Sequence, residues 1–168
     1  MEVRGAGAGG AGILWAPDLV ITNAHVVRAS RVRIGLADGR EVPGELVAAD
    51  RRADLALLGV PRSGVAPATL GDSDALRVGA LVVALGHPLG WPRTLTAGVV
   101  HALATARPTG RRWIHADVRL APGNSGGPLA DAVGRVVGVI TMMAAGLAVA
   151  IPINEARRFV VSTGAGGA

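Results

Sequence analysis

The residues best suited to covalent chemistry in this chain surround Ser125, in the run GNSGGP that spans residues 123–128. Small neighbours allow the backbone to turn tightly there and leave the serine hydroxyl exposed. A glycine at position 123 lets its own N–H point toward a substrate oxygen, because no Cβ stands in the way. With the N–H of Ser125, this group would form an oxyanion hole, in which losing one donor typically costs about 10²- to 10³-fold in rate. The run therefore predicts a serine nucleophile.

The same run also matches G-x-S-x-G, the nucleophile motif of the α/β-hydrolases. In that fold the chain order is serine, acid, histidine, whereas the four histidines of this chain, at positions 25, 87, 101 and 115, all precede Ser125. The sequence also lacks the alternation of strands and helices that an α/β fold requires. The order histidine, aspartate, serine is available instead, and it is the order of the chymotrypsin-like proteases.

His25 is the leading candidate for the general base, because it comes just after the strand-like run Leu19–Thr22 and a base at the end of a buried strand is held rigidly. The competing histidines are His87, which precedes a proline in a turn, and His115, which lies within a strand. Asp54 is the candidate acid. It opens the apolar run DLALL, where a partly buried carboxylate needs a partner. The alternatives for it are a turn cap or an ion pair with one of the preceding arginines.

The elements that must position these groups are short β-strands. Half of the residues are hydrophobic, mostly aliphatic, and 25 glycines and 10 prolines interrupt the apolar runs. Branched aliphatic residues favour strands, and frequent turn residues between short apolar runs indicate an all-β fold. We therefore expect about ten to twelve short strands in two groups, forming two antiparallel barrels that pack together, with one terminal helix.

The expected organisation divides the chain into five consecutive parts. They are a Gly/Ala-rich segment at residues 1–12, a first barrel at 13–70, a connector at 71–79, a second barrel at 80–152 and a C-terminal helix at 153–161. The Gly/Ala-rich segment fits a flexible linker, but it also fits an edge strand or a loop packed close to other backbone. Asn154 is the expected N-cap of the helix.

Composition bounds the partners and the compartment. The net charge is +5, but the basic residues are all arginines, scattered and without interleaved aromatics, so no nucleic-acid partner is expected. The absence of cysteine excludes a disulfide, a thiolate metal site and a cysteine nucleophile. The start of the chain lacks the apolar region of a signal peptide, and no apolar stretch reaches the length of a membrane span. A cytoplasmic protein and a trimmed domain of an exported one both stay open.

Taken together, the chain resembles the HtrA (Deg) family of trypsin-like serine proteases over roughly residues 10–159. Six stretches carry the resemblance: TNAHVV at 22–27, ADLALL at 53–58, GHPLG at 86–90, LTAGVV at 95–100, APGNSGGPL at 121–129 and AVAIP at 148–152. The resemblance implies a chymotrypsin/trypsin-type fold of two six-stranded antiparallel β-barrels with a short C-terminal helix. Relatives usually carry PDZ domains and an N-terminal extension with trimer contacts. Neither is expected in this chain, so monomer and trimer both stay open.

The resemblance also implies a serine endopeptidase with a catalytic triad of His25, Asp54 and Ser125, acting on unfolded or extended polypeptides in protein quality control. His25 would take the proton of Ser125 Oγ, and Asp54 would hold the tautomer of His25. Asn124 is implied to assist Gly123 and Ser125 in the oxyanion hole. No metal or cofactor is implied.

The strand that ends at residues 140–143 is expected to lie beside a substrate that binds as an added β-strand. The candidate substrate-binding residues are Thr141, Met142, Met143, Leu147 and Val149. No acidic residue stands near them in the sequence to receive a basic side chain. We therefore expect cleavage after small or medium apolar residues, with the alternative that these side chains belong to the core.

Two alternatives to a constitutively active protease stay open. The first is a catalytically silent domain that kept the fold to bind peptides, although such a domain has no need to retain all three triad residues. The second is a latent protease, in which the loop at residues 121–124 is collapsed until a ligand orders it.

Overall fold

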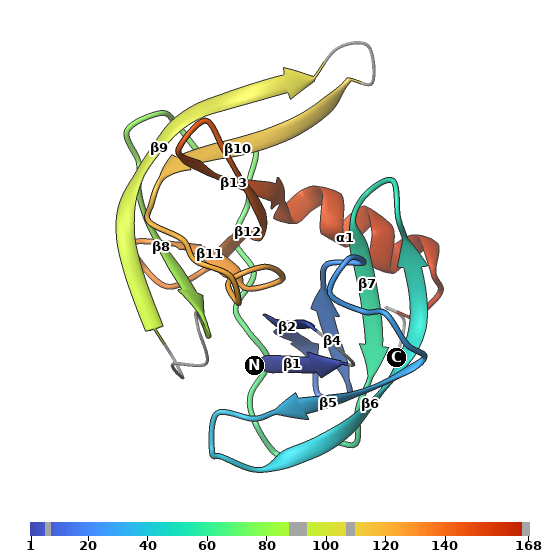
Figure 1. The fold of residues 1–168 in the computed structure, drawn as a ribbon. Helices are drawn as coiled ribbons and strands as arrows, with labels where there is room; N and C mark the ends of the chain where they lie inside the picture. The colour runs from blue at the N-terminus through green and yellow to red at the C-terminus, as the bar shows by residue number, and fades with distance from the viewer. Residues whose placement is uncertain (6–7, 88–93, 107–109, 166–168) are drawn as a thin grey trace.

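The computed structural model describes residues 1–5, 8–87, 94–106 and 110–165, which form two antiparallel sheets and one helix (Figure 1). The first sheet contains β1 (Glu2–Gly5), β2 (Ala8–Ala11), β3 (Ile13–Ala16), β4 (Leu19–Thr22), β5 (Arg31–Gly35), β6 (Glu41–Asp50) and β7 (Leu55–Gly59). The second contains β8 (Leu81–Gly86), β9 (Thr94–Ala106), β10 (Arg111–Asp117), β11 (Pro128–Asp131), β12 (Val136–Ala144) and β13 (Leu147–Pro152), followed by helix α1 (Ile153–Ser162). The predicted all-β class with two barrel-like sheets is confirmed.

The first sheet curls back on itself at a bent N-terminal stretch. Its strand order is β2-β1-β5-β6-β7-β4-β3, so β2 and β3 form its two ends. Only Gly12 separates these two strands in the chain, so one bent stretch provides both ends of the sheet. A Cβ at Gly12 would lie 2.8 Å from Cγ1 of Val20, which explains the glycine at the bend. Because this stretch forms two strands, the first sheet has seven strands where six were expected.

The Gly/Ala-rich N-terminal segment is part of the first sheet. In β1, Val3 is fully buried and pairs with Gly10 of β2 and with Ile34 of β5. The small residues of β2 permit a close approach to the second barrel, where the N–H of Ala11 donates to the carbonyl of Ser125 at 2.7 Å. Of the interpretations that the sequence left open, the structure shows a strand packed against other backbone.

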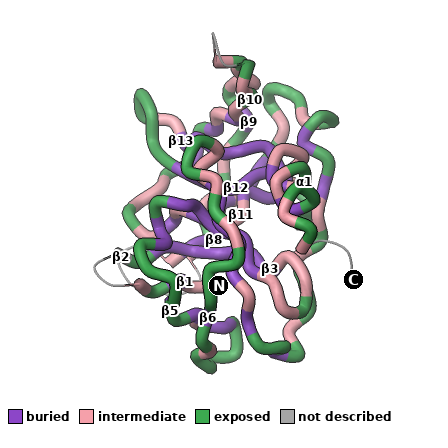
Figure 2. The backbone as a smooth tube through the Cα atoms, turned by 90° about the vertical axis from the view of Figure 1, so that its right-hand side faces the viewer, coloured by how far each residue is buried: buried purple, intermediate pink, exposed green. Residues whose placement is uncertain are grey.

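The second sheet is a closed barrel with the strand order β10-β13-β12-β11-β8-β9. Alternate residues of its strands face inward, as in β8, where Val82 and Ala84 are buried while Leu81 is 63% exposed. Each barrel has its own cluster of buried aliphatic side chains. Figure 2 shows the buried stretches running through the interior of both sheets, with exposed stretches toward the periphery.

A third apolar cluster joins the two barrels beneath α1. Three buried residues of the helix, Ile153, Ala156 and Val160, take part in it. Residues of both sheets complete the cluster, namely Ile13, Ile21, Leu55, Leu57, Val136, Val139 and Ile151. Through these contacts the helix holds the two barrels in a fixed relative position. It thereby also fixes the candidate site residues on one barrel relative to those on the other. Within the described ranges, no helix is long and apolar enough to cross a membrane.

The start of α1 corrects one prediction. The N-cap is Pro152, so the expectation that Asn154 caps the helix is wrong. The side-chain Nδ2 of Asn154 donates instead to Asp72 Oδ1 at 2.7 Å and to Asp74 Oδ2 at 3.0 Å. These acceptors lie about eighty residues earlier in the chain, in the connector between the barrels, and local sequence rules for caps do not reach them.

Candidate active site

The ends of two neighbouring strands bring His25 and Asp54 together. Strand β4 pairs antiparallel with β7, with Thr22 opposite Ala56, so the chain leaving β4 meets the chain entering β7. Nδ1 of His25 lies 2.9 Å from Oδ2 and 3.0 Å from Oδ1 of Asp54, and the backbone N–H of His25 donates to Oδ1 at 3.1 Å. An imidazole that donates from Nδ1 to a carboxylate presents Nε2 as a proton acceptor. The arrangement favours the tautomer that a general base needs.

Asp54 is held from both barrels in a strained backbone conformation. Its φ of +53° lies in the left-handed region, which costs a non-glycine residue roughly 1–3 kcal/mol. Nδ2 of Asn23 donates to the backbone carbonyl of Asp54 at 2.9 Å, and Oγ1 of Thr141 donates to Oδ2 at 2.5 Å. Both partners are buried, whereas the side chain of His25 is 51% exposed. The candidate acid, Asp54, is thus held by buried partners, and the candidate base, His25, faces the solvent.

Ser125 lies in the turn before β11, in the second barrel. Its carbonyl accepts the N–H of Ala11, which ties the turn to the first sheet. Its Oγ donates to the backbone carbonyl of Thr141 at 3.1 Å. Both side chains are within the described part of the chain, and there Ser125 makes no hydrogen bond with the ring of His25. Thr141 therefore contacts both halves of the candidate triad, the acid through its hydroxyl and the serine through its carbonyl.

The turn before Ser125 leaves two backbone N–H groups without a partner among the residues that the structure describes. Gly123 has a φ of +108°, which a glycine adopts without strain. Within the described residues, the N–H groups of Gly123 and Ser125 make no hydrogen bond and remain available as donors. Asn124 differs from the expectation, because its own N–H donates to the carbonyl of Ala121 at 3.2 Å and its side chain is buried against Gly86. The backbone N–H of Asn124 is therefore engaged within the turn, whereas the assistance of its side chain in the oxyanion hole stays a prediction.

A small apolar cavity of about 230 Å³ opens beside Ser125. It is lined by Leu120, Ala121, Pro122, Asn124, Ser125, Ile140, Met142 and Met143, none of which is charged. Met142 and Met143 are 49% and 44% exposed, and the flexible thioether side chain of methionine adapts to varied ligands. An apolar side chain fits this cavity better than a charged one, which would lose its hydration without a partner.

Comparison with known proteins shows which family has this arrangement. The family model described as a trypsin-like peptidase domain matches residues 10–139, a stretch that contains all three candidate triad residues. The chain belongs to this family. A probable periplasmic serine endoprotease DegP-like from Halomonas elongata is 40% identical over 157 residues, covering 88% of this chain and 33% of the relative. A putative serine protease HhoA from Synechocystis sp. is 38% identical over 178 residues, covering 99% and 45%.

The peptidase domain spans between a third and a half of the length of these curated relatives. Among solved structures, the HtrA-type protease AlgW with a decapeptide matches with a TM-score of 0.87 at 32% identity, covering 94% of the peptidase domain and 52% of that chain. AlgW with a tripeptide matches with a TM-score of 0.89 at 30% identity, covering 97% and 60%. The HtrA resemblance that the sequence motifs predicted is confirmed.

The predicted substrate-binding residues separate into two groups in the peptidase domain. Met142 and Met143 line the cavity beside Ser125. Thr141 is buried and directs its hydroxyl to the acid, while Leu147 and Val149 lie on β13 and do not line the cavity. Val149 is only 4% exposed, so it is placed as a core residue, the alternative that the sequence had left open.

Four cavity residues were missed by the sequence reading. Leu120, Ala121 and Pro122 come directly before the serine turn, and Ile140 comes two residues before Met142 on β12. Alternate residues share a face in a regular strand, so Met142 would have pointed to Ile140 if β12 were regular. The register shift between these two residues hides this relation, because a bulge changes which side chains point together.

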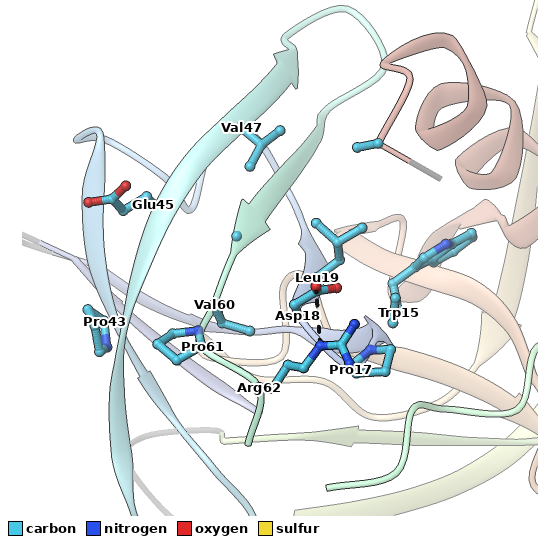
Figure 3. A pocket seen from close by; sticks show the side chains of 13 residues that line it. Trp15, Pro17, Asp18, Leu19, Pro43, Glu45, Val47, Val60, Pro61 and Arg62 are labelled. Carbon is cyan, nitrogen blue, oxygen red and sulfur yellow. Dashed lines mark ion pairs between the residues drawn. The ribbon is translucent and has the colours of Figure 1, made fainter. Parts of the chain in front are cut away.

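A larger cavity, of about 870 Å³, lies on the first barrel (Figure 3). Trp15, Leu19 and Val47 contribute apolar surface to it, and Nε of Arg62 lies 3.8 Å from Oδ2 of Asp18 at its wall. None of the three candidate triad residues lines this cavity. Among the described residues, no group of three or more His, Asp and Glu side chains is placed to hold a metal ion. Of the three candidate triad residues, Ser125 lines the smaller cavity.

Proposed function

We propose that this peptidase domain is a serine endopeptidase that cleaves unfolded or extended polypeptides, with His25, Asp54 and Ser125 as its triad. The observation that carries the proposal is the pairing of His25 with Asp54 at 2.9 Å, which Thr141 links to the turn of Ser125. The similarity to a serine endoprotease from Halomonas elongata and a serine protease from Synechocystis sp. supports the same class.

The reaction follows from the roles of these groups. Ser125 Oγ attacks the carbonyl carbon of the peptide bond while Nε2 of His25 accepts the hydroxyl proton, and Asp54 stabilises the imidazolium. The N–H groups of Gly123 and Ser125 stabilise the tetrahedral oxyanion. The C–N bond then breaks, and His25 gives its proton to the leaving amine. Water, deprotonated by His25, hydrolyses the acyl-enzyme, releases the acid and restores the serine hydroxyl.

The serine hydroxyl must change its partner before this reaction. A hydroxyl has one proton to donate, and here Ser125 donates it to the carbonyl of Thr141. Proton transfer to His25 requires that this hydrogen bond break. The carbonyl of Thr141 is then free to accept a backbone N–H from the substrate, so that substrate binding and activation of the serine become one event.

The substrate site is the open edge of β12 beside the small cavity. Strand β12 pairs with β13 as far as Ala144, whereas its pairing with β11 ends at Val139. Residues 141–143 thus present one edge to which an extended peptide can add as a strand. The cavity next to Ser125 then receives the side chain before the cut, and its apolar lining favours a small or medium apolar residue. The AlgW structures with bound peptides support a peptide ligand.

A fluorophosphonate probe tests the proposal directly. The purified protein should gain one covalent adduct by intact mass, and the variants Ser125→Ala and His25→Ala should gain none. Hydrolysis of an unfolded protein substrate should be lost in the same two variants. A parent protein that binds peptides but neither hydrolyses them nor forms an adduct would instead be a silent peptide-binding domain.

The latent form of the protease makes a different prediction. In that case the adduct and the hydrolysis would appear only after a peptide ligand is added. The N–H groups of Gly123 and Ser125, which have no partner in the described part of the chain, favour an available oxyanion hole over a collapsed one. Labelling with and without an apolar peptide ligand separates the two forms.

A further inference from the structure

Arg111 connects three separate parts of the molecule where the barrels meet. It is the first residue of β10, in the second barrel, and its side chain is only 16% exposed. Its Nε donates to Oε1 of Glu155 in α1 at 3.0 Å, and its guanidinium carbon lies 4.2 Å from the centre of the Trp113 ring. Its two terminal nitrogens donate to the backbone carbonyls of Arg52 and Ala53 in the first barrel.

Those two carbonyls belong to the turn that delivers Asp54. The carbonyl of Ala53 is part of the peptide group whose nitrogen is that of Asp54, so holding this oxygen fixes the plane from which the φ of Asp54 is set. That φ is +53°, a conformation that a non-glycine residue keeps only with support from its surroundings. Inside the turn, Oδ1 of Asp50 accepts the N–H groups of Arg52 at 2.8 Å and Ala53 at 2.9 Å. Arg111 adds two hydrogen bonds to this turn from the second barrel.

The geometry requires an arginine. The planar guanidinium donates in three directions at once, to Glu155 and to two carbonyls, and it stacks on Trp113. A lysine is a point charge and cannot reproduce this fork. The neighbouring Arg112 serves as a contrast, because it forms an ion pair with Asp74 in which both side chains are about half exposed, at 49% and 55%.

We propose that Arg111 is a positioning residue for the triad. His25 and Asp54 come from the first barrel and Ser125 from the second, so contacts that cross between the barrels set their alignment. Arg111 holds the peptide group before Asp54 against the second barrel and thereby keeps the carboxylate of Asp54 in the orientation in which it bonds His25. This inference rests on the proposed function, since its effect is measured on the catalytic rate and on the hydrogen bond between His25 and Asp54.

The test compares Arg111→Met and Arg111→Lys with Arg112→Met as the matched control. We expect Arg111→Met to lower kcat by about 10- to 100-fold while KM changes by less than about twofold, because small misplacements of reacting groups are costly whereas the substrate edge is untouched. Arg111→Lys should recover part of the loss, since it keeps the charge but not the fork. Arg112→Met should keep the parent kcat.

A second readout does not depend on turnover. The proton on Nδ1 of His25 is shifted downfield in the NMR spectrum when it is bonded to Asp54. We expect this signal in the parent and in Arg112→Met, and its broadening or loss in Arg111→Met. If the parent forms no adduct with a fluorophosphonate and hydrolyses nothing, the proposed function fails, and the signal alone decides the role of Arg111.

Three results would overturn the inference. The first is a parental kcat and a parental signal in Arg111→Met, even with a lowered Tm, because the arginine would then serve stability alone. The second is a lower kcat with an unchanged signal, since the acid–base pair would not be what moved. If Arg111→Met does not fold, the third is a parental kcat and signal in Arg111→Lys.

Discussion

The two barrels hold their parts of the site in different ways. In the first barrel, His25 and Asp54 are already paired, and Asp54 is fixed by buried hydrogen bonds. In the second barrel, the hydroxyl of Ser125 is bonded to a backbone carbonyl, and the N–H groups of Gly123 and Ser125 have no partner within the described residues. The candidate acid and base are thus already paired, whereas the hydroxyl of the candidate nucleophile is bonded to the carbonyl of Thr141 and not to His25.

The difference has a structural cause. His25 and Asp54 extend from the ends of β4 and β7, whose paired register places them together. Ser125 lies in a turn whose shape depends on contacts with other elements, such as the hydrogen bond from Ala11 to its carbonyl. Preorganised acid–base groups lower the cost of proton transfer. In the proposed reaction, the hydroxyl of Ser125 has to leave the carbonyl of Thr141 before it transfers its proton to His25.

Removing either reacting group should have the largest effect. Ser125→Ala and His25→Ala should each lower kcat by about 10⁶-fold, and combining them should cost little more, because the two residues act as a unit. Hydrolysis of an apolar peptide followed by mass spectrometry measures this. Circular dichroism should show that both variants stay folded. Retention of parental kcat in either variant would contradict the assignment.

Asp54→Asn should have the next largest effect, about 10⁴-fold in kcat, because the amide favours the wrong tautomer of His25 while the geometry stays intact. The same peptide assay measures it. Asp38→Asn is the matched control: Asp38 is an exposed residue whose ion pair with Arg40 lies in a hairpin of the first barrel. Equal rates for the two variants would argue against a specific role for Asp54.

Gly123→Ala should lower kcat by about 10²- to 10³-fold, because a side chain is strained at a φ of +108° and the rotated peptide withdraws one oxyanion donor. The rate of fluorophosphonate labelling should fall with it. Gly134→Ala provides the control, since Gly134 has a φ of +84° in an open turn away from the site. A loss of similar size in both variants would show that backbone strain, not the oxyanion hole, is responsible.

Thr141→Val should cost about 10-fold in kcat, as expected for one hydrogen bond to a charged group. The substitution removes the hydroxyl that donates to Asp54 and keeps the backbone carbonyl that accepts from Ser125. Thr141→Ser should restore most of the rate. If the valine variant equals the parent, the link between the two barrels through this side chain is not part of the mechanism.

The smallest effect is expected in the cavity. The parent should cleave a peptide library mainly after small or medium apolar residues, and Met142→Leu should change kcat/KM by less than about tenfold, because the swap nearly conserves volume. Cleavage mainly after arginine or lysine would contradict the apolar cavity. This measurement concerns only residues of the second barrel. It therefore tests that barrel separately from the pair of His25 and Asp54 in the first.

Much of this arrangement follows from local sequence. The strand patterns predict the barrels, and the order of His25, Asp54 and Ser125 selects one chemistry over the esterase alternative. Local sequence patterns do not predict contacts between segments that are far apart in the chain. The hydroxyl of Thr141 on Asp54 and the guanidinium of Arg111 on the preceding turn both cross between barrels.

The same limit explains the corrections. Asn154 finds acceptors in the connector instead of capping its helix. Asn124 has its N–H bound within the turn, and Val149 is buried on a strand whose register no local pattern fixes. The partners of Asn154 lie far along the chain, and the burial of Val149 depends on a strand pairing with a register shift, whereas the hydrogen bond of Asn124 closes a local turn. Residue type and spacing alone do not specify such partners.

The most direct test of the contrast between the barrels is a crystal structure with a peptide boronate that carries an apolar residue next to boron. We predict a tetrahedral boron on Ser125 Oγ, one boronate oxygen bound by the N–H groups of Gly123 and Ser125, and a released carbonyl of Thr141. The distance between His25 Nδ1 and Asp54 should stay near its present 2.9 Å. A boronate found elsewhere, or an acid–base pair that rearranges as much as the serine turn, would contradict the account.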